Sequence, residues 1–591
     1  MEPNVDRYSR PDPKISRESS LHNLNPQQEQ HEKLCAAAAV IPFHRTTTRE
    51  EQQQMLMAEE ELLQELRSKA NELFLREQWA ESSSLYSQLI DLCRVHLSST
   101  DGASDPDKFS KLRKSLCLAL ANRADASSKL RSLDEALRDC DEALAIESSH
   151  FRALVCKGKI LLSLSKYSAA LECFKSAASL DAQANGNCGT LNACLEKCKM
   201  LEYQSRTGNF DLSDWVASGF HREIPELAEY IGPVLIKKSE ISGRGLFATK
   251  NIDVGTVVLV TRAIAIERGI VMGEDSGSGE NKQLVMWKNF IDRVAGCVSK
   301  SRRTRHLIST LSSGEDEEGL EVPDLSIFRA EASERDDYPN EKLDMNKILG
   351  ILDVNSLVED AISAKVMGRN KDYYGVGLWF LASFVNHSCC PNARRLHVGN
   401  HLMVVTSRDV KAGDELTFPY FDVLQPPKKR REAAAPWGFD CSCKRCEFEE
   451  KMRSKQELRD IEAGLEGGMD VGGVVYRLEE GMRRWNARGR EKGYLRASFW
   501  AAYSETYASE KSVKKWGRRI PAAEAVVDSV AEATGSDERV LKVLVEQLSS
   551  RSGGGLGGGG VIGEMEKALK LGRGIYGKVV KKQALRGLIE L

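Results

Sequence analysis

Small and aliphatic residues recur 34 residues apart in the first third of this chain, and this period restricts its fold most. The matched pairs are Ala124 with Gly158, Leu133 with Tyr167, Ala136 with Ala170, Ala143 with Ala177, Ile146 with Leu180 and Glu147 with Asp181. Small side chains at fixed positions let paired helices pack closely, and this period is typical of a helix-turn-helix solenoid. An earlier unit beginning at Lys69 has the same pattern, displaced by a polar insertion over residues 98–110. We therefore expect three repeats over residues 66–181 rather than an ordinary helical bundle.

Length and composition indicate a multidomain protein without a membrane span. The chain has 591 residues, which exceeds one ordinary hydrophobic core and predicts two to four domains. Its formal net charge of −2 gives no overall attraction to nucleic acid or to membranes, so we expect direct binding to neither. No stretch reaches the roughly 18 apolar residues of a spanning helix, and the polar N-terminal segment does not resemble a secretory or transit peptide. These features predict a location in the nucleus, the cytoplasm or both.

Changes in composition predict an α+β protein, with a compact β-rich core flanked by two helical regions. The segments are a disordered tail (1–58), helical repeats (59–205), the β-rich core (231–425) with a polar insertion at 262–350, a cysteine-rich loop (436–450) and a helical C-terminal region (451–591). The clearest strand-like runs are Val234–Ile236, Val257–Val260, His401–Thr406 and Glu415–Phe418. Helical stretches are expected near 284–298 and 342–352, inside the insertion.

The distribution of the cysteines separates a packing role from a metal-binding role. Nine of the 15 lie singly before residue 200 in helical sequence, where a lone cysteine is most often a small buried apolar residue. Five others cluster at Cys389, Cys390, Cys441, Cys443 and Cys446, and in a reducing compartment such a cluster suggests a metal rather than disulfides. The last three form a C-x-C-x2-C loop, which can supply three corners of a zinc tetrahedron. A redox C-x-x-C is disfavoured by the third cysteine and by the missing βαβ context.

Four motifs follow one another between residues 243 and 446. They are Gly243–Phe247 (GRGLF), Asn386–Asn392 (NHSCCPN), Gly413–Tyr420 (GDELTFPY) and Phe439–Cys446 (FDCSCKRC). The order of these motifs and the residues in them resemble a SET domain with its post-SET zinc loop. The resemblance is closest to the SMYD group and related SET proteins with tetratricopeptide repeats. The resemblance covers residues 231–450, with the insertion unmatched. The MYND zinc finger of the SMYD group is missing, because residues 262–350 contain only Cys297.

The resemblance implies a protein-lysine N-methyltransferase that uses S-adenosylmethionine and Zn2+. The residues it assigns to the cofactor are Gly243, Arg244, Gly245, Asn355, Asn386, His387, Tyr420 and Phe439. The glycine turn would bind the methionine part, Asn386 and His387 the amine and the adenine, and Phe439 would stack on the adenine. The zinc ligands it implies are Cys389, Cys441, Cys443 and Cys446, with the adjacent Cys390 as the alternative fourth ligand. An Asn-His pair or a glycine turn alone is more often structural, so these assignments depend on the motifs together.

Tyr420 is the predicted catalytic residue. Methyl transfer is an in-line displacement at a sulfonium methyl group, so the attacking amine must be deprotonated, aligned and shielded from water. A phenol at the end of a strand can orient that amine without acting as a strong base, since its ordinary pKa is about 10. The proton of the amine would then leave through water in the channel. The Gly-Asp-Glu-Leu-Thr sequence before Tyr420 favours this role over that of a core tyrosine.

The substrate and the number of methyl groups stay open at this stage. The family often has aromatic residues lining the lysine channel where this chain has Leu357 and Trp437, so the degree of methylation is not fixed. The substrate would be a histone or a non-histone protein, and the repeats would bind a protein partner on their concave face. The alternative is a repeat scaffold with a catalytically weak or inactive SET core.

Three other segments are interpreted without a catalytic role. Residues 572–577 (GRGIYG) match a dinucleotide-binding fingerprint but follow helical sequence rather than a strand. Residues 426–431 (PPKKRR) fit a nuclear signal or, equally well, a solvated loop. The glycine run at 552–560 indicates a flexible linker or loop.

Overall fold

The computed structural model describes residues 49–99, 105–183, 189–218, 223–270, 279–314, 319–329, 343–359, 373–452, 454–552 and 558–590. The chain divides into two compact units, residues 1–66 and 67–591, which are described separately. The described part of the first unit belongs to helix α2 (Arg49–Leu75), so helical structure begins at Arg49 rather than at residue 59. The rest of the predicted tail, residues 1–48, lies outside the described residues.

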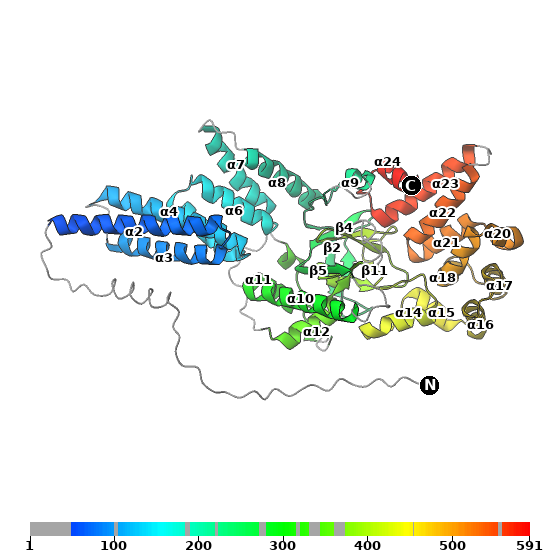
Figure 1. The fold of residues 1–591 in the computed structure, drawn as a ribbon. Helices are drawn as coiled ribbons and strands as arrows, with labels where there is room; N and C mark the ends of the chain where they lie inside the picture. The colour runs from blue at the N-terminus through cyan, green and yellow to red at the C-terminus, as the bar shows by residue number, and fades with distance from the viewer. Residues whose placement is uncertain are drawn as a thin grey trace, which may run out of the picture. The chain divides into compact units, whose positions relative to one another are not determined.

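The second unit opens with the helical repeats (Figure 1). After α2 come α3 (Trp79–Ser99), α4 (Pro106–Lys129), α5 (Leu133–Ile146), α6 (Phe151–Ser163), α7 (Tyr167–Gln183) and α8 (Gly189–Thr207). The recurring small residues lie where these helices meet, and Ala124, Ala136, Ala143, Ala170 and Ala177 are all fully buried. Gly158 has the same role, because a Cβ atom on it would lie 2.7 Å from Cε1 of Phe174.

The turn inside each repeat has one backbone geometry. Glu77, Arg131 and Ser165 have φ angles of 62°, 64° and 60°, in the left-handed region that residues with a Cβ atom rarely adopt. Each lies between the two helices of a pair, and the positions of Arg131 and Ser165 differ by the repeat period (165 − 131 = 34). The same bend at the same place in successive units confirms the predicted helix-turn-helix repeats.

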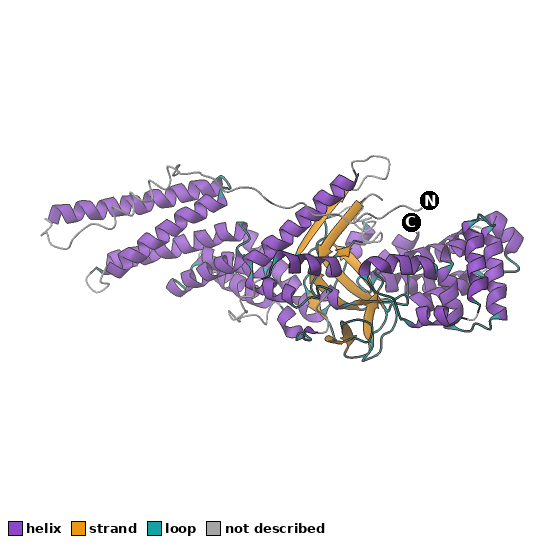
Figure 2. Cartoon of the chain, turned by 90° about the horizontal axis from the view of Figure 1, so that it is seen from below, coloured by secondary structure: helices purple, strands orange, loops and turns teal. Residues whose placement is uncertain are grey.

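The described strands form three sheets with the orders β1-β4-β10-β9, β2-β3-β11-β8 and β5-β7-β6. The strands are β1 (Tyr230–Ile231), β2 (Val234–Lys238), β3 (Arg244–Ala248), β4 (Val257–Arg262), β5 (Ala265–Ile270), β6 (Leu357–Val358), β7 (Tyr373–Leu378), β8 (Asn386–His387), β9 (Ala393–Val398), β10 (His401–Thr406) and β11 (Glu415–Phe418). The predicted runs correspond to β2, β4, β10 and β11. Figure 2 shows the strands gathered in one region of the second unit.

The first sheet is buried on both faces. Along β10, Leu402 and Val404 join the core of the β-rich region, whereas Met403 and Val405 join a second core with the C-terminal helices. Successive side chains of a strand point to opposite faces, so this alternation places the sheet between the two cores. The C-terminal region is therefore packed on the β-rich core through a shared sheet.

The insertion contains α10 (Gly279–Lys300), α11 (Arg302–Ser309), the 3-10 turn η2 (Leu325–Phe328) and α12 (Met345–Asn355). Helices α10 and α12 correspond to the two helical stretches expected there. Strand β5 lies inside the insertion predicted at about 262–350, yet it pairs with core strand β7, so in the structure the paired core strands extend to Ile270. The sequence pattern did not predict β5 because the strand contains charged residues. One of them, Arg268, forms a 2.6 Å ion pair with Glu359, whose side chain is fully buried.

The C-terminal region is helical, as predicted. After α14 (Pro427–Ala434), η4 (Ala435–Trp437) and α15 (Lys444–Lys451) it comprises α16 (Lys455–Glu466), α17 (Val471–Arg484), α18 (Arg490–Ser498), α19 (Trp500–Ala508), α20 (Glu510–Trp516), α21 (Ala523–Thr534), α22 (Glu538–Ser552), α23 (Gly558–Tyr576) and α24 (Lys582–Glu590). None of the described helices in the chain combines the length and apolar character needed to cross a bilayer.

The three segments set aside in the sequence have simple structural explanations. Residues 427–434 form helix α14 and Arg430 is buried beside Glu449, so a solvated loop is the wrong description of this stretch. The GRGIYG motif lies at the end of helix α23, with Gly572 packed against Leu585, and has no strand before it. Of the glycine run, residues 553–557 lie outside the described residues and 558–560 begin α23.

Candidate active site and metal centre

Strands β8 and β11 bring the second and third motifs together. They pair in parallel, with Asn386 opposite Thr417 and His387 opposite Phe418. The buried Asn386 amide then reaches the first motif: its Nδ2 lies 3.1 Å from the carbonyl oxygen of Ser242 and 3.2 Å from that of Arg244. Two segments more than 140 residues apart in sequence are thus held at one point.

Glu415 organises this point from the third motif. Its carboxylate accepts hydrogen bonds from Asn386 Nδ2 at 2.8 Å and from the Ser239 hydroxyl at 2.9 and 2.8 Å. Burial raises the pKa of Glu415, and the bonds from Asn386 and Ser239 oppose that rise only in part. The motif pattern did not identify Glu415 as a site residue, although it lies inside GDELTFPY.

The glycine turn has two different reasons for its glycines. Gly243 has a φ of 46°, which favours a residue without a side chain. Gly245 instead faces Glu415, because a Cβ atom on it would lie 2.2 Å from Glu415 Oε1. Gly245 therefore leaves room for this carboxylate, and the cofactor role of the glycine turn stays a prediction. Arg244 between them donates from Nη1 to the carbonyl oxygens of Thr310 and Glu321, at 2.7 and 3.1 Å, so its side chain reaches the insertion.

Tyr420 and His387 are joined through backbone and side chain. The Tyr420 N–H donates to His387 Nδ1 at 3.0 Å, and the Tyr420 hydroxyl donates to the carbonyl oxygen of Val385 at 3.0 Å. Burial lowers the pKa of His387 to about 3, so the ring is neutral. Because Nδ1 accepts a hydrogen bond, the single ring proton is on Nε2, which lies 3.4 Å from Cys389 Sγ.

Aromatic rings surround this pair. The His387 ring stacks on Phe421 with centroids 4.3 Å apart and lies 5.5 Å from Phe439. The Tyr420 ring lies 4.9 Å from Trp437 and 6.1 Å from Phe439. Phe439 and Trp437, both singled out in the sequence, are therefore brought to Tyr420. Phe421 was missed, although its position directly after Tyr420 was a signal that could have been used.

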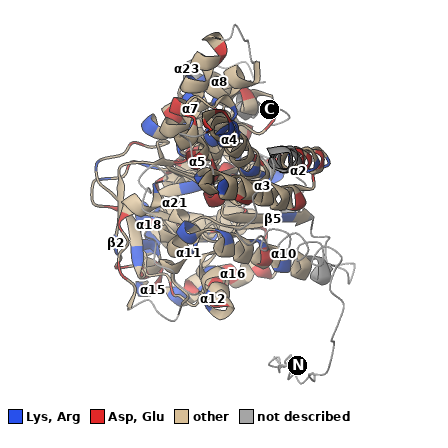
Figure 3. Ribbon diagram, turned by 90° about the vertical axis from the view of Figure 1, so that its left-hand side faces the viewer, with Lys and Arg blue, Asp and Glu red and all other residues tan. Residues whose placement is uncertain are grey.

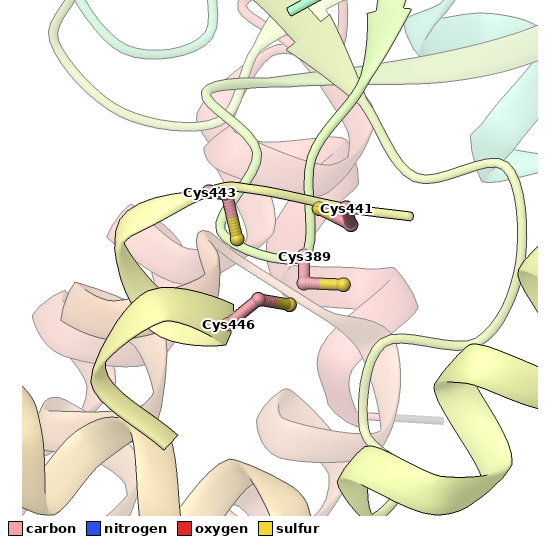
Figure 4. A group of neighbouring side chains, drawn as sticks. All are labelled: Cys389, Cys441, Cys443 and Cys446. Atoms are coloured by element: carbon pink, nitrogen blue, oxygen red, sulfur yellow. The ribbon is translucent and has the colours of Figure 1, made fainter. Parts of the chain in front are cut away.

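Four cysteines from two segments form a compact group (Figure 4). The sulfur atoms of Cys389, Cys441, Cys443 and Cys446 all lie within 4.8 Å of one another. Tetrahedral zinc with Zn–S bonds of about 2.3 Å needs sulfur atoms about 3.8 Å apart, so the donor set and its spacing fit a structural zinc ion. The group contains Cys389 and not Cys390, whose Sγ lies 3.5 Å from Ser388 Oγ.

Buried arginines attach the cysteine group to the C-terminal helices. Arg445, with no exposed surface, donates to the carbonyl oxygens of Cys389 (3.3 Å) and Val423 (2.7 Å) and to the Ser498 hydroxyl (2.7 Å). Arg430 donates to Cys446 Sγ at 3.1 Å and pairs with the buried Glu449. A cation beside zinc-bound thiolates offsets part of their negative charge. No sequence signal distinguished these two arginines from surface ones.

Two of the predicted residues lie next to the insertion. Both amide hydrogens of Asn355 are used inside the protein, because Nδ2 donates to the carbonyl oxygens of Ser312 and Ile351 at 2.8 Å each. Only its Oδ1 remains as an acceptor for a ligand. Leu357 is buried in the core on strand β6. The cofactor role of Asn355 stays a prediction, and its side-chain N–H groups already donate to carbonyl oxygens of the protein.

Comparisons with known proteins agree with the geometry. A family model described as SET domain matches residues 243–421. A Gibberella zeae protein named Methyltransferase is 23% identical over 416 residues, which is 66% of this chain and 52% of that protein. Human Histone-lysine N-methyltransferase SMYD3 is 40% identical over 78 residues, 13% of this chain and 18% of that enzyme. The chain thus spans about half the length of the first relative and less than a fifth of the second.

A solved structure, the TPR2B-domain:pHsp70-complex of yeast Sti1, is 23% identical and covers 23% of this chain and 96% of its own, with a TM-score of 0.19. The repeats themselves are established by the recurring turns and small residues described above. Residues 243–421 therefore match a SET domain, TPR-like helical repeats precede them in the chain, and proteins named as methyltransferases are among those that the chain is similar to.

Proposed function

We propose that the chain transfers a methyl group from S-adenosylmethionine to a lysine side chain of another protein. The observation that supports this most is the joining of Asn386, His387 and Tyr420 into one hydrogen-bonded site inside the SET match. Two of the proteins that the chain is similar to are named as methyltransferases.

The bound cofactor supplies an electrophilic methyl group, and the residues of this chain hold the reactants around it. Asn386 and the 239–245 turn fix one wall, and the His387, Phe421 and Phe439 rings supply an apolar surface on which an adenine can stack. The Tyr420 hydroxyl donates its proton to the Val385 carbonyl, so toward an amine it can act only as an acceptor. Lining by rings rather than charges also excludes water, which favours attack by the amine.

The four cysteines would hold zinc as a structural ion rather than as a reactant. Four thiolates leave no open position for substrate, and a closed site of this kind orders a loop. The hydrogen bond from His387 Nε2 to Cys389 Sγ links this loop to the cofactor wall. We infer that the metal centre and the cofactor site form together.

The repeats would choose the protein partner, with either a histone or a non-histone protein as the substrate. The rival hypothesis, a scaffold whose SET core is inactive, requires that the site residues be present without turnover. No feature of the site favours it, since each predicted residue of the Tyr420 network has a defined partner.

The experiment is to incubate the full chain with methyl-labelled S-adenosylmethionine and a cell extract, and to identify the labelled protein by mass spectrometry. The proposal expects methyl groups on lysine side chains. Label on other residue types would refute lysine specificity, and absence of label with a cofactor that binds would favour the scaffold hypothesis.

A further inference from the structure

A cleft of about 970 Å³ lies between the helical repeats and the SET core, apart from the Tyr420 site. Its walls are the turns of the second and third repeats, the β4–β5 corner, and helices α10 and α11. Hydrogen bonds join the two sides: Arg262 Nη1 donates to the Ser163 carbonyl at 3.3 Å, and the Glu229 N–H donates to the Tyr167 hydroxyl at 3.1 Å. Lys300 Nζ donates to the carbonyl oxygen of Leu130 at 3.4 Å.

The lining of this cleft is basic although the chain as a whole carries a net charge of −2. Six lining side chains are cationic: Arg131, Arg262, Arg293, Lys300, Arg303 and Arg329. Only Asp134 and Glu229 are acidic in the lining. Three of the cations come from α10 and α11, where Lys and Arg positions can be followed in blue in Figure 3. Such a local excess attracts anionic groups into the cleft.

Several of these cations keep hydrogen-bonding capacity for a ligand. Arg131, Lys300 and Arg329 are exposed, and Lys300 uses one of its three N–H groups on Leu130. The Nε of Arg303 is buried and has no acceptor among the described residues, although its Nη2 donates to Ile327 and Phe328. A buried donor without a partner is unfavourable, and an entering acceptor would satisfy it.

The cations occupy two parts of the cleft rather than one point. Arg131, Arg293 and Lys300 lie close enough to Cys297 in α10 for their charges to oppose the rise of its pKa on burial. The charge of Arg329 has the same effect on the pKa of Tyr230, and that of Arg262 on the pKa of Tyr167. Apolar side chains such as Leu133, Ile264 and Phe380 line the same cavity. A single phosphate would use one group of cations only, whereas an extended ligand with several spaced anions and apolar groups would use both.

We propose that this cleft binds an Asp- and Glu-rich peptide segment of the protein that is methylated. Arginine forks match carboxylates well, and the apolar wall would take hydrophobic side chains between the acidic ones. A nucleic-acid backbone fits less well, because Asp134 and Glu229 would repel its continuous phosphates. This inference rests on the proposed function for the identity of the ligand, but the binding itself does not require turnover.

The cleft is also close in the chain to the reacting centre. Phe380 and Leu381 line it, and Leu381 begins the short turn η3 (Leu381–Phe384). The next residue is Val385, whose carbonyl accepts the Tyr420 hydroxyl, and then comes Asn386. A peptide seated in the cleft therefore contacts the segment that carries the site, and would anchor a substrate beside it.

The test uses the full chain and fluorescence anisotropy with a labelled 12-residue peptide of alternating Glu and Leu, without cofactor. The variant is Arg131→Glu, Lys300→Glu and Arg329→Glu together. Glu is tolerated at position 131, because Glu77 adopts the same φ in the first repeat. The control reverses three exposed cations elsewhere, Lys514→Glu, Lys542→Glu and Arg490→Glu, for the same change in charge.

We expect the cleft variant to bind the acidic peptide about tenfold more weakly or worse, and the control within about twofold of the unmodified chain. Replacing every Glu of the peptide by Gln should remove binding. Equal weakening in both variants, or equal binding of the Glu and Gln peptides, overturns the proposal. It is also overturned if a 12-nucleotide uridine RNA binds more tightly than the acidic peptide, or if millimolar inorganic phosphate displaces the peptide fully. If the triple variant unfolds at lower temperature, Lys300→Gln with Arg329→Gln replaces it. Peptide binding without methyl transfer would refute the proposed function alone.

Discussion

Replacing Glu415 by Gln should weaken cofactor binding without destabilising the fold. The carboxylate accepts hydrogen bonds from both Ser239 and Asn386, and Asn386 in turn holds the 242–244 carbonyls. Both donors reach Glu415 Oε1, so a glutamine oxygen can still accept from them, but neither bond is then made to a charged group and both are weakened. A hydrogen bond to a charged group contributes about 1.5–3 kcal/mol, and each 1.4 kcal/mol is a factor of ten, so we expect the cofactor Kd to rise roughly tenfold to a hundredfold.

The free energy of unfolding of the same variant should not decrease, although its cofactor affinity does. Burial raises the pKa of Glu415 more than its hydrogen bonds lower it, so the folded state holds the protonated carboxyl more tightly than the unfolded state does. The stability from this group is therefore present below the ordinary glutamate pKa and is lost as the pH rises through the raised value. Glutamine stays neutral, so Glu415→Gln should not unfold more easily than the unmodified chain at neutral pH.

The assay is titration calorimetry with S-adenosylmethionine, together with thermal unfolding at pH 5 and pH 8. The control is Glu240→Gln, an exposed carboxylate near Ser239 whose charge also acts on Glu415. A Glu415→Gln protein that binds cofactor as tightly as the unmodified chain would refute the positioning role. A large loss of stability with unchanged affinity would show that Glu415 acts in folding alone.

Three further results are expected. Cys441→Ser should lose bound zinc, measured by emission spectroscopy, and should weaken cofactor binding at the same time. The reason is that structural zinc sites contribute on the order of 10 kcal/mol to the order of their loops. Loss of zinc with unchanged cofactor affinity would contradict this coupling. A chain beginning at Asn209 should fold and bind cofactor by calorimetry, and failure to bind when folded would mean that the repeats take part in the cofactor site. Burial favours protonation of Asp422, but bonding to Arg539 and its charge lower the pKa of Asp422 to about 2, so this pair stabilises the fold above about pH 4 and is lost as the pH falls toward 2. Arg539→Gln should remove that part of the acid sensitivity in unfolding curves from pH 7 to pH 2, and an unchanged curve would assign it to other groups.

The sequence predicted the elements whose signals are local. The repeat period predicted the helical pairs, since packing small residues at fixed positions leaves the same trace in each unit. The strand-like runs located β2, β4, β10 and β11, and the motifs located Tyr420, the Asn386–His387 pair and the cysteine group. In these cases the residue types themselves mark the positions that the structure brings together, whereas the chemical roles of the motif residues stay predictions.

The rest depended on partners far apart in the sequence. Arg268 in β5 looks like a surface residue in the sequence, but in the structure it is paired with the buried Glu359. Arg430 in α14 likewise suggests a solvated basic loop, but it is paired with the buried Glu449. The segment before the SET core was also missed. Leu212 and Trp215 belong to the core of the C-terminal helices, and the Leu212 N–H donates to the carbonyl oxygen of Val579 at 2.8 Å. A shortened chain must therefore begin near Asn209 rather than at residue 231, where the predicted β-rich core begins.

The central claim, that this site transfers methyl groups, is tested most directly by Tyr420→Phe. Cofactor affinity by calorimetry and methyl transfer to a verified protein substrate are measured on the same preparation, with Tyr203→Phe, an exposed tyrosine in the repeats, as the matched control. The account predicts a cofactor Kd within about twofold of the unmodified chain and a turnover lowered by about a hundredfold or more, because the hydroxyl acts mainly in the transition state. Wild-type turnover in Tyr420→Phe, with the control unchanged, would contradict it.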